Sequence, residues 1–180
     1  MKQLLAGLKA PVHRTLAALC YGAGLRISEA CRLKVDDIDS RRMVIHVRNG
    51  KGGKDRQVAL GAALLEQLRA YWRWRRPTGT YLFPGRRRSR PYLTTAAFQK
   101  ALKLSVAASG IDKPVTPHTL RHSYATHMIE AGADLRTVQL LLGHASLRST
   151  TRYVHLTHAR LQQVASPLDM LGGKEGERFG

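Results

Sequence analysis

One hairpin signature constrains the fold more than any other feature of this sequence. Residues 43–48 (MVIHVR) alternate apolar and polar side chains, and residues 56–60 (RQVAL) resemble a partner strand. Residues 49–55 (NGKGGKD) lie between them and are rich in glycine, which is typical of the tip of a β-hairpin. Most of the remaining sequence has helical period. We therefore expect an α+β fold that is mainly α-helical, with a small antiparallel β-sheet near residues 43–60.

Apolar residues recur at helical spacing on both sides of this hairpin, and glycines and capping residues divide them into helices. The N-terminal residues through 35 are predicted to be amphipathic helix with a break at Gly22 and Gly24. Residues 35–40 are predicted to form a turn, 77–92 a loop with one short extended piece, and 114–118 a connector. Two further helices are predicted before the connector, one at residues 62–74 and one that begins at Thr94 or Thr95 and ends at 109. Four more are predicted after it. The first follows residue 118 and ends at 131, the second begins after the capping residue Asp134 and ends at 142, and the last two cover residues 146–153 and 157–165.

The length of 180 residues suits one domain, which we place at residues 1–171. Residues 172–180 (GGKEGERFG) are predicted to be a disordered tail. No run of 18 apolar residues occurs, so we expect no membrane span. Cys20 and Cys31 are too few for a disulfide framework or a four-cysteine metal site, and two reduced core thiols fit a cytoplasmic protein.

The charge of the chain indicates its partner. Thirty Lys and Arg residues stand against 12 Asp and Glu residues, which gives a formal net charge of +18. An excess of this size favours a polyanion, and nucleic acid is the expected one. Composition separates neither DNA from RNA nor binding from chemistry.

The segment HTLRH carries two histidines and an arginine within one helical turn. His118 and His122 are four residues apart, which is also the spacing of a zinc-binding helix. In the H-x-x-E-H form of such a helix a glutamate stands next to the second histidine, and Arg121 occupies that position here. Because a guanidinium would oppose a dication, we expect no metal here. Anion binding fits better, since Arg121 can donate two bonds to a phosphate and His118 can exchange a proton.

The segment GLRISE places Arg26 between Leu25 and Ile27. An arginine among apolar residues is expected either to be paired or to reach into a polar cleft. Glu29, three residues further along a helix, could orient it, and a purely structural Arg26–Glu29 ion pair is the alternative.

The remaining motifs supply a possible proton donor and a possible nucleophile. The hairpin tip carries Lys51 and Lys54, and a lysine there could protonate a leaving oxygen, unless the tip is simply solvated. His144 follows Gly143 at a predicted helix end, and Tyr153 follows nine residues later. A phenol is a weak nucleophile until its proton is removed or its oxyanion is stabilised.

Taken in order, these motifs resemble the catalytic set of the tyrosine recombinases, a family that includes phage and integron integrases and Xer-type enzymes. The resemblance covers roughly residues 10–165 and rests on YGAGLRISEA, GKGGKDR, TPHTLRHSYATH, LLGH and STTRYVH. It implies a site-specific recombinase that cuts and rejoins DNA through a 3′-phosphotyrosyl intermediate. The implied catalytic residues are Arg26, Lys51, His118, Arg121, His144 and Tyr153, with Glu29 orienting them.

The resemblance also implies the partners. Double-stranded DNA is the expected substrate, no cofactor is expected, and four copies of the chain are expected in a synapse that exchanges the C-terminal segment in trans. A protein of this kind would act in the cytoplasm at the nucleoid. The expected DNA contacts are Lys54, Arg56, Arg86, Arg87, Arg88, Arg90, Arg148 and Arg152.

Family members usually also carry an N-terminal DNA-clamping domain, which we do not find in this sequence. Two other functions use similar features. A type IB topoisomerase-like enzyme would need the same residues, and a DNA-binding regulator would keep the fold with an inactive site. An RNA-binding module is disfavoured because no aromatic sheet motif occurs.

Overall fold

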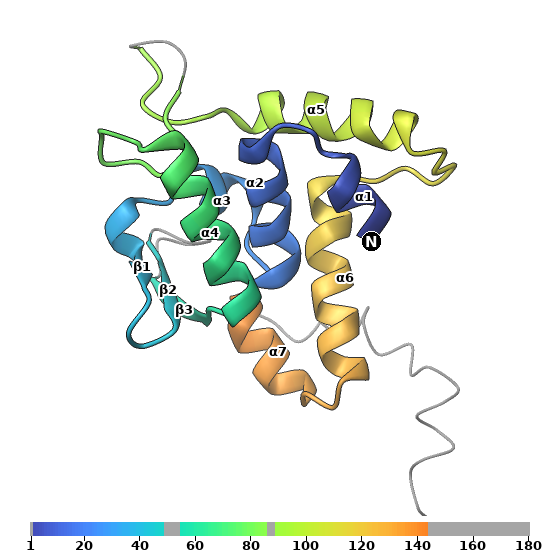
Figure 1. Ribbon diagram of the computed structural model, residues 1–180. Coiled ribbons are helices and arrows are strands. Elements are labelled where there is room, and N and C mark those ends of the chain that lie inside the picture. Colours follow the sequence, from blue (N-terminus) through green and yellow to red (C-terminus); the bar gives the residue numbers. More distant parts are fainter. Residues whose placement is uncertain (1, 49–54, 86–88, 144–180) are drawn as a thin grey trace, which may run out of the picture.

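A buried helix, α2 (Pro11–Gly22), lies at the centre of the fold, and five of the other helices pack around it (Figure 1). The computed structural model describes residues 2–48, 55–85 and 89–143. Helix α2 contacts α1 (Lys2–Gly7), α3 (Ile27–Cys31), α4 (Ala62–Arg75), α5 (Thr95–Ala108) and α6 (Pro117–Glu130). Leu16 and Leu19 of α2 are fully buried in this core.

The N-terminal region differs from the prediction of one amphipathic helix broken only at the glycines. The chain forms two helices, α1 and α2, and Pro11 is the first residue of the second. Proline suits that position because the first N–H of a helix has no intrahelical partner and the fixed φ of proline is already helical.

The predicted hairpin is present and belongs to a three-stranded antiparallel sheet. Strands β2 (Val44–Val47) and β3 (Arg56–Ala59) pair with Val47 opposite Arg56, and β1 (Ile38–Asp39) pairs with the other edge of β2. Residues 35–40 were predicted to form only a turn, but they form a short 3₁₀ helix, η1 (Val35–Asp37), followed by β1. Ile45, Val47 and Val58 turn their side chains into the core.

Capping side chains fix where the later helices begin. Thr94 accepts a hydrogen bond from the N–H of Ala97 at the start of α5, and Asp134 accepts one from Thr137 at the start of α7 (Leu135–Leu142). Both helices were predicted with these caps. Helix α6 begins at Pro117 rather than after His118, because Thr116 caps it and Pro117 occupies its first position. His118 therefore lies in the first turn of α6.

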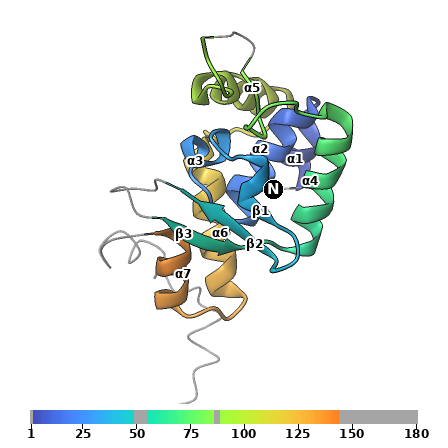
Figure 2. The same ribbon diagram turned by 90° about the vertical axis from the view of Figure 1, so that its left-hand side faces the viewer.

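Helix α7 packs against both α6 and β3, so the end of the described chain lies beside the sheet (Figure 2). Cys20 and Cys31 are buried and free, and burial raises the pKa of the Cys31 thiol to about 12. Among the described helices, none is both long and apolar enough to cross a lipid bilayer.

Candidate active site

The turn between α2 and α3 builds the first part of the site. Gly24 has φ of +64°, in the left-handed region that side chains disfavour, and a Cβ added there would lie 2.6 Å from Cδ1 of Tyr124. Only glycine fits this turn without displacing α6. The turn leads directly into Arg26 and presents the carbonyl of Gly24 to α6.

Arg26 precedes the first residue of α3 and is held by Glu29 of the same helix. Its backbone N–H donates to Oε2 of Glu29 at 2.8 Å, and its Nη1 donates to Oε1 at 2.9 Å. The Arg26 side chain remains 27% exposed, whereas Glu29 is only 5% exposed. The predicted contact between these residues is therefore present, and the guanidinium also faces a cavity.

Arg121 reaches the same place from α6. Its Nη1 donates to the carbonyl of Gly24 at 2.6 Å, and its Nη2 donates to the carbonyl of Leu142 at 2.5 Å. Nη1 also lies 3.8 Å from Oε2 of Glu29. The residue is only 2% exposed, so its charge is balanced inside the protein by a carboxylate and two carbonyl dipoles.

Arg26, His118 and Arg121 line one cavity of about 280 Å³. His118 lies one helical turn before Arg121 and is exposed. Two further polar side chains line this cavity and were missed from the sequence, namely Gln99 of α5 and Thr116 at the start of α6. Neither stands in a recognisable motif, so only the packing of α5 beside the first turn of α6 reveals them.

Arg56, predicted to contact DNA, donates hydrogen bonds to groups inside the protein. Its Nη1 and Nη2 donate to the two carboxylate oxygens of Glu29, both at 2.8 Å, and its Nε donates to the carbonyl of Leu141 at 3.1 Å. Its side chain is 12% exposed. Arg56 is separated from Glu29 by 27 residues, and no local pattern in the sequence signals this pair.

Three guanidinium groups thus surround Glu29. Burial raises the pKa of this carboxyl, but hydrogen bonds from Arg56 and Arg26 together with the charge of Arg56 outweigh it and lower the pKa to about 2. The carboxylate is therefore ionised at any pH at which the protein would work. It neutralises part of the positive charge that the arginines bring together.

This depressed pKa predicts how stability depends on pH. The stabilising effect of the Glu29 carboxylate should be fully present above its ordinary pKa near 4.5 and should be lost as pH falls through about 2. The shift corresponds to about 3 kcal/mol. We expect the difference in unfolding free energy between wild type and Glu29→Gln, measured in urea, to be largest above pH 4.5. A difference that stays constant down to pH 2 would contradict the ion-pair cluster.

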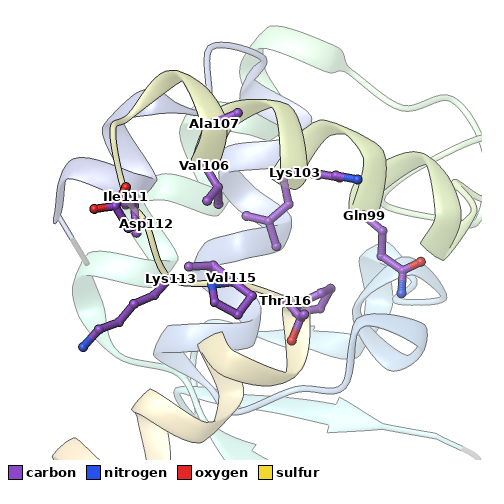
Figure 3. Close-up of a pocket in the computed structure, with 12 residues that line it drawn as sticks. Gln99, Lys103, Val106, Ala107, Ile111, Asp112, Lys113, Val115 and Thr116 are labelled. Carbon is purple, nitrogen blue, oxygen red and sulfur yellow. The ribbon is translucent and has the colours of Figure 1, made fainter.

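A second and larger pocket, of about 550 Å³, lies between α5 and the connector to α6 (Figure 3). It shares Gln99, Thr116 and Pro117 with the arginine-lined cavity. Its other lining is largely apolar, with Val106, Ala107, Ile111 and Val115 among the labelled side chains. Lys103 and Lys113 also line this pocket. The smaller cavity is the candidate active site because two guanidinium groups, which can each donate two bonds to a phosphate, line it together with a histidine.

Other predicted site residues lie outside the described residues: Lys51, Lys54, Arg86, Arg87, Arg88, His144, Arg148, Tyr153 and Arg152. Arg90 is described and exposed. The zinc alternative rested on His118 and His122; within 2–48, 55–85 and 89–143, no three or more His, Cys, Asp or Glu side chains are grouped to hold a metal. Burial and the neighbouring His118 lower the pKa of His122.

Solved structures share this fold. The chain superposes on a crystal structure of XerA recombinase with a TM-score of 0.77 and 34% identity, covering 90% of this chain and 60% of that one. A crystal structure of XerH site-specific recombinase bound to difH substrate gives a TM-score of 0.75 and 30% identity, covering 93% and 52%. The fold is therefore that of a tyrosine recombinase catalytic domain.

Sequence comparison identifies the same family. The model of the phage integrase family matches residues 1–160, and the chain belongs to that family. Tyrosine recombinase XerA of Pyrococcus furiosus is 42% identical over 159 residues, which cover 88% of this chain and 55% of that protein. Tyrosine recombinase XerD of Pseudomonas putida is 40% identical over 157 residues, covering 84% and 52%. The chain thus spans about half the length of the curated relatives it matches.

Proposed function

We propose that this chain carries the catalytic centre of a site-specific DNA recombinase that works through a phosphotyrosine intermediate. The observation that supports this most is the single cavity lined by Arg26, Arg121 and His118. Phosphoryl transfer depends mainly on positioning and on stabilising charge, and two guanidinium groups beside one histidine supply both. Family membership supports the same reaction.

The reaction begins when the Tyr153 oxygen attacks the scissile phosphorus. A P–O bond forms to the tyrosine, the bond to the 5′-oxygen breaks, and the strand is left with a 3′-phosphotyrosyl link and a free 5′-hydroxyl. Arg26 and Arg121 hold the non-bridging oxygens of the phosphate. His118 takes up the tyrosine proton, Lys51 protonates the leaving 5′-oxygen, and His144 hydrogen-bonds the phosphate.

Rejoining follows from the same chemistry in reverse. The phosphotyrosyl link conserves the energy of the phosphodiester, so a 5′-hydroxyl from another strand can displace the tyrosine without ATP. The arginines and lysine stabilise the developing charge, which is the role that a divalent cation plays in other phosphoryl-transfer enzymes. The reaction as proposed needs no cofactor.

Double-stranded DNA is the proposed partner. The net charge of +18 favours it, and the arginines of residues 86–90 together with Lys54, Arg148 and Arg152 are proposed to contact its backbone. The matched XerH structure is bound to difH substrate. Recombining two duplexes requires four copies of the chain in a synapse, and we infer that the apolar segment 156–171 packs on a neighbouring copy. Such a protein would act in the cytoplasm on nucleoid DNA.

The proposed function is tested by trapping the covalent intermediate. The chain is incubated with a pool of nicked duplexes whose arms are randomised, so that cleavage releases a short strand and the link accumulates. We expect a protein–DNA adduct that survives denaturation, with mass spectrometry placing the nucleotide on Tyr153. EDTA should not change the yield; strong inhibition would instead favour the metal alternative at His118 and His122.

A second assay separates recombination from simple nicking and closing. The sequence recovered from the adduct defines the selected site. DNA carrying two copies of this site is incubated with the chain, and joint molecules are scored against relaxation of supercoiled DNA. Joint molecules are expected from a recombinase. Relaxation without joint molecules would point to the topoisomerase-like alternative, and DNA binding without any adduct would point to a regulator.

A further inference from the structure

Arg56 begins β3 and reaches across to the first turn of α3. Its two terminal nitrogens each donate to a different carboxylate oxygen of Glu29 at 2.8 Å. This fork fixes both the position and the plane of the carboxylate, which a single-point contact would not. Glu29 in turn binds the backbone and the side chain of Arg26 and lies 3.8 Å from Arg121.

The third donor of Arg56 contacts a different element. Its Nε donates to the carbonyl of Leu141 in the last turn of α7, while Arg121 donates to the carbonyl of Leu142. The last carbonyls of a helix have no intrahelical partners and carry the negative end of its dipole. Two guanidinium groups satisfy them here. Gly143, in the left-handed conformation, packs against the Arg56 side chain, which would lie 3.0 Å from an added Cβ.

A single side chain therefore connects three elements that share no neighbouring sequence: β3, α3 and the end of α7. We propose that Arg56 is a positioning residue for phosphoryl transfer, acting through Glu29 on Arg26 and Arg121 rather than by contacting DNA. This inference rests on the proposed function, and it replaces the expectation that Arg56 binds the DNA backbone. Its donors are directed at internal acceptors, and the described residues that line the cavity include Arg26 and Arg121 but not Arg56.

Arg56→Lys separates the two roles. A lysine keeps the charge and can still attract a phosphate, but its point charge cannot bind both oxygens of Glu29 and the Leu141 carbonyl together. We expect Arg56→Lys to bind the selected nicked duplex with wild-type affinity and salt dependence. Its rate of adduct formation at saturating DNA should fall about 10²-fold, the size of effect that a small misplacement of binding groups produces.

Arg69→Ala is the matched control. Arg69 also pairs with a glutamate at 2.8 Å, but it lies on the surface of α4 with its side chain 53% exposed. A second variant at the same position, Arg56→Ala, removes the positive charge altogether. Arg69→Ala also loses one positive charge, but it leaves Glu29 and its three arginines unchanged. We expect its rate of adduct formation to equal that of wild type.

The pH profile gives a readout that a merely structural role would not change. Among the described residues, three guanidinium groups face Glu29: Arg26 at the start of α3, Arg56 of β3 and Arg121 of α6. Glu29 in turn helps to raise the pKa of the buried Cys20 thiol of α2. Removing the Arg56 fork should raise the pKa of Glu29. The rate of Arg56→Ala should therefore decline on the acid side at pH values where wild type and Arg69→Ala show no decline.

A measurement without DNA separates a failure of this inference from a failure of the proposed function. In heteronuclear NMR spectra of the whole chain, the side-chain Nε–Hε resonances of Arg26 and Arg121 are sensitive to the surroundings of each guanidinium, whose Nη atoms make the hydrogen bonds described above. Arg56→Lys should shift both resonances, and Arg69→Ala should leave them unchanged. Resonances that stay at their wild-type positions in Arg56→Lys would overturn the positioning role even if wild type forms no adduct.

Activity data can also overturn the proposed positioning role of Arg56. If Arg56→Lys forms the adduct at the wild-type rate, the fork to Glu29 is dispensable. If Arg56→Ala instead loses affinity, with the salt slope reduced by about one unit and its rate at saturating DNA unchanged, then Arg56 contacts a phosphate. A wild-type chain that forms no adduct while Arg56→Lys shifts the two resonances would count against the proposed reaction alone.

Discussion

A Tyr153→Phe variant is expected to form no covalent adduct with DNA while binding the same duplex as tightly as wild type. The substitution removes only the phenolic oxygen, the atom proposed to bond to phosphorus. Other groups of the site can hold a phosphate, but none of them replaces a missing nucleophile. The adduct is measured on denaturing gels with the nicked duplex, and affinity is measured by fluorescence anisotropy.

Tyr92→Phe is the control for this substitution. Tyr92 is half-buried, its ring stacks at an angle on that of Tyr81, and it lies in the loop before α5. Removing its hydroxyl tests whether loss of any phenol lowers the yield. We expect the wild-type yield from Tyr92→Phe. An adduct that persists in Tyr153→Phe would assign the nucleophile to another residue.

The elements predicted well from sequence are those whose signals are local. The alternation in residues 43–48 and 56–60 with a glycine-rich tip predicted β2 and β3, and Asp134 and Gly143 marked the two ends of α7. These signals act within a few residues, so a single sequence carries them. Strand β1 was missed because two residues show no period, and it forms only by pairing with β2.

The contacts of the candidate site also divide into local ones, which the sequence predicted, and long-range ones, which it did not. The Arg26–Glu29 contact was anticipated because the residues are three apart at the start of one helix. The pair between Arg56 and Glu29 was not anticipated, because it joins β3 to α3 and depends on how the sheet packs against the helices. The bonds from Arg121 to Gly24 and Leu142 were missed for the same reason. Motifs identified the charged residues, and only the fold shows which of their charges neutralise one another.

Arg121→Ala is expected to have the second large effect, on stability as well as on the reaction. The variant leaves the carbonyls of Gly24 and Leu142 without these donors and removes one cation beside the buried Glu29. Breaking a buried charge cluster from one side typically costs about 3–5 kcal/mol. We expect a loss of that size in the unfolding free energy measured in urea. Adduct formation should fall by about 10²–10³ at a temperature where the variant is still folded.

Two further variants separate the structural and the phosphate-binding roles of Arg121. Arg121→Lys keeps the charge near Glu29 but cannot donate to both carbonyls at once, so we expect part of the stability to return while adduct formation stays low. Arg136→Ala removes an exposed arginine of α7 whose side chain donates to Oε1 of Gln139, and should change stability by no more than about 0.5 kcal/mol. If Arg121→Ala were as stable as Arg136→Ala, the carbonyls and Glu29 would not depend on Arg121, and the cluster would not act as one unit.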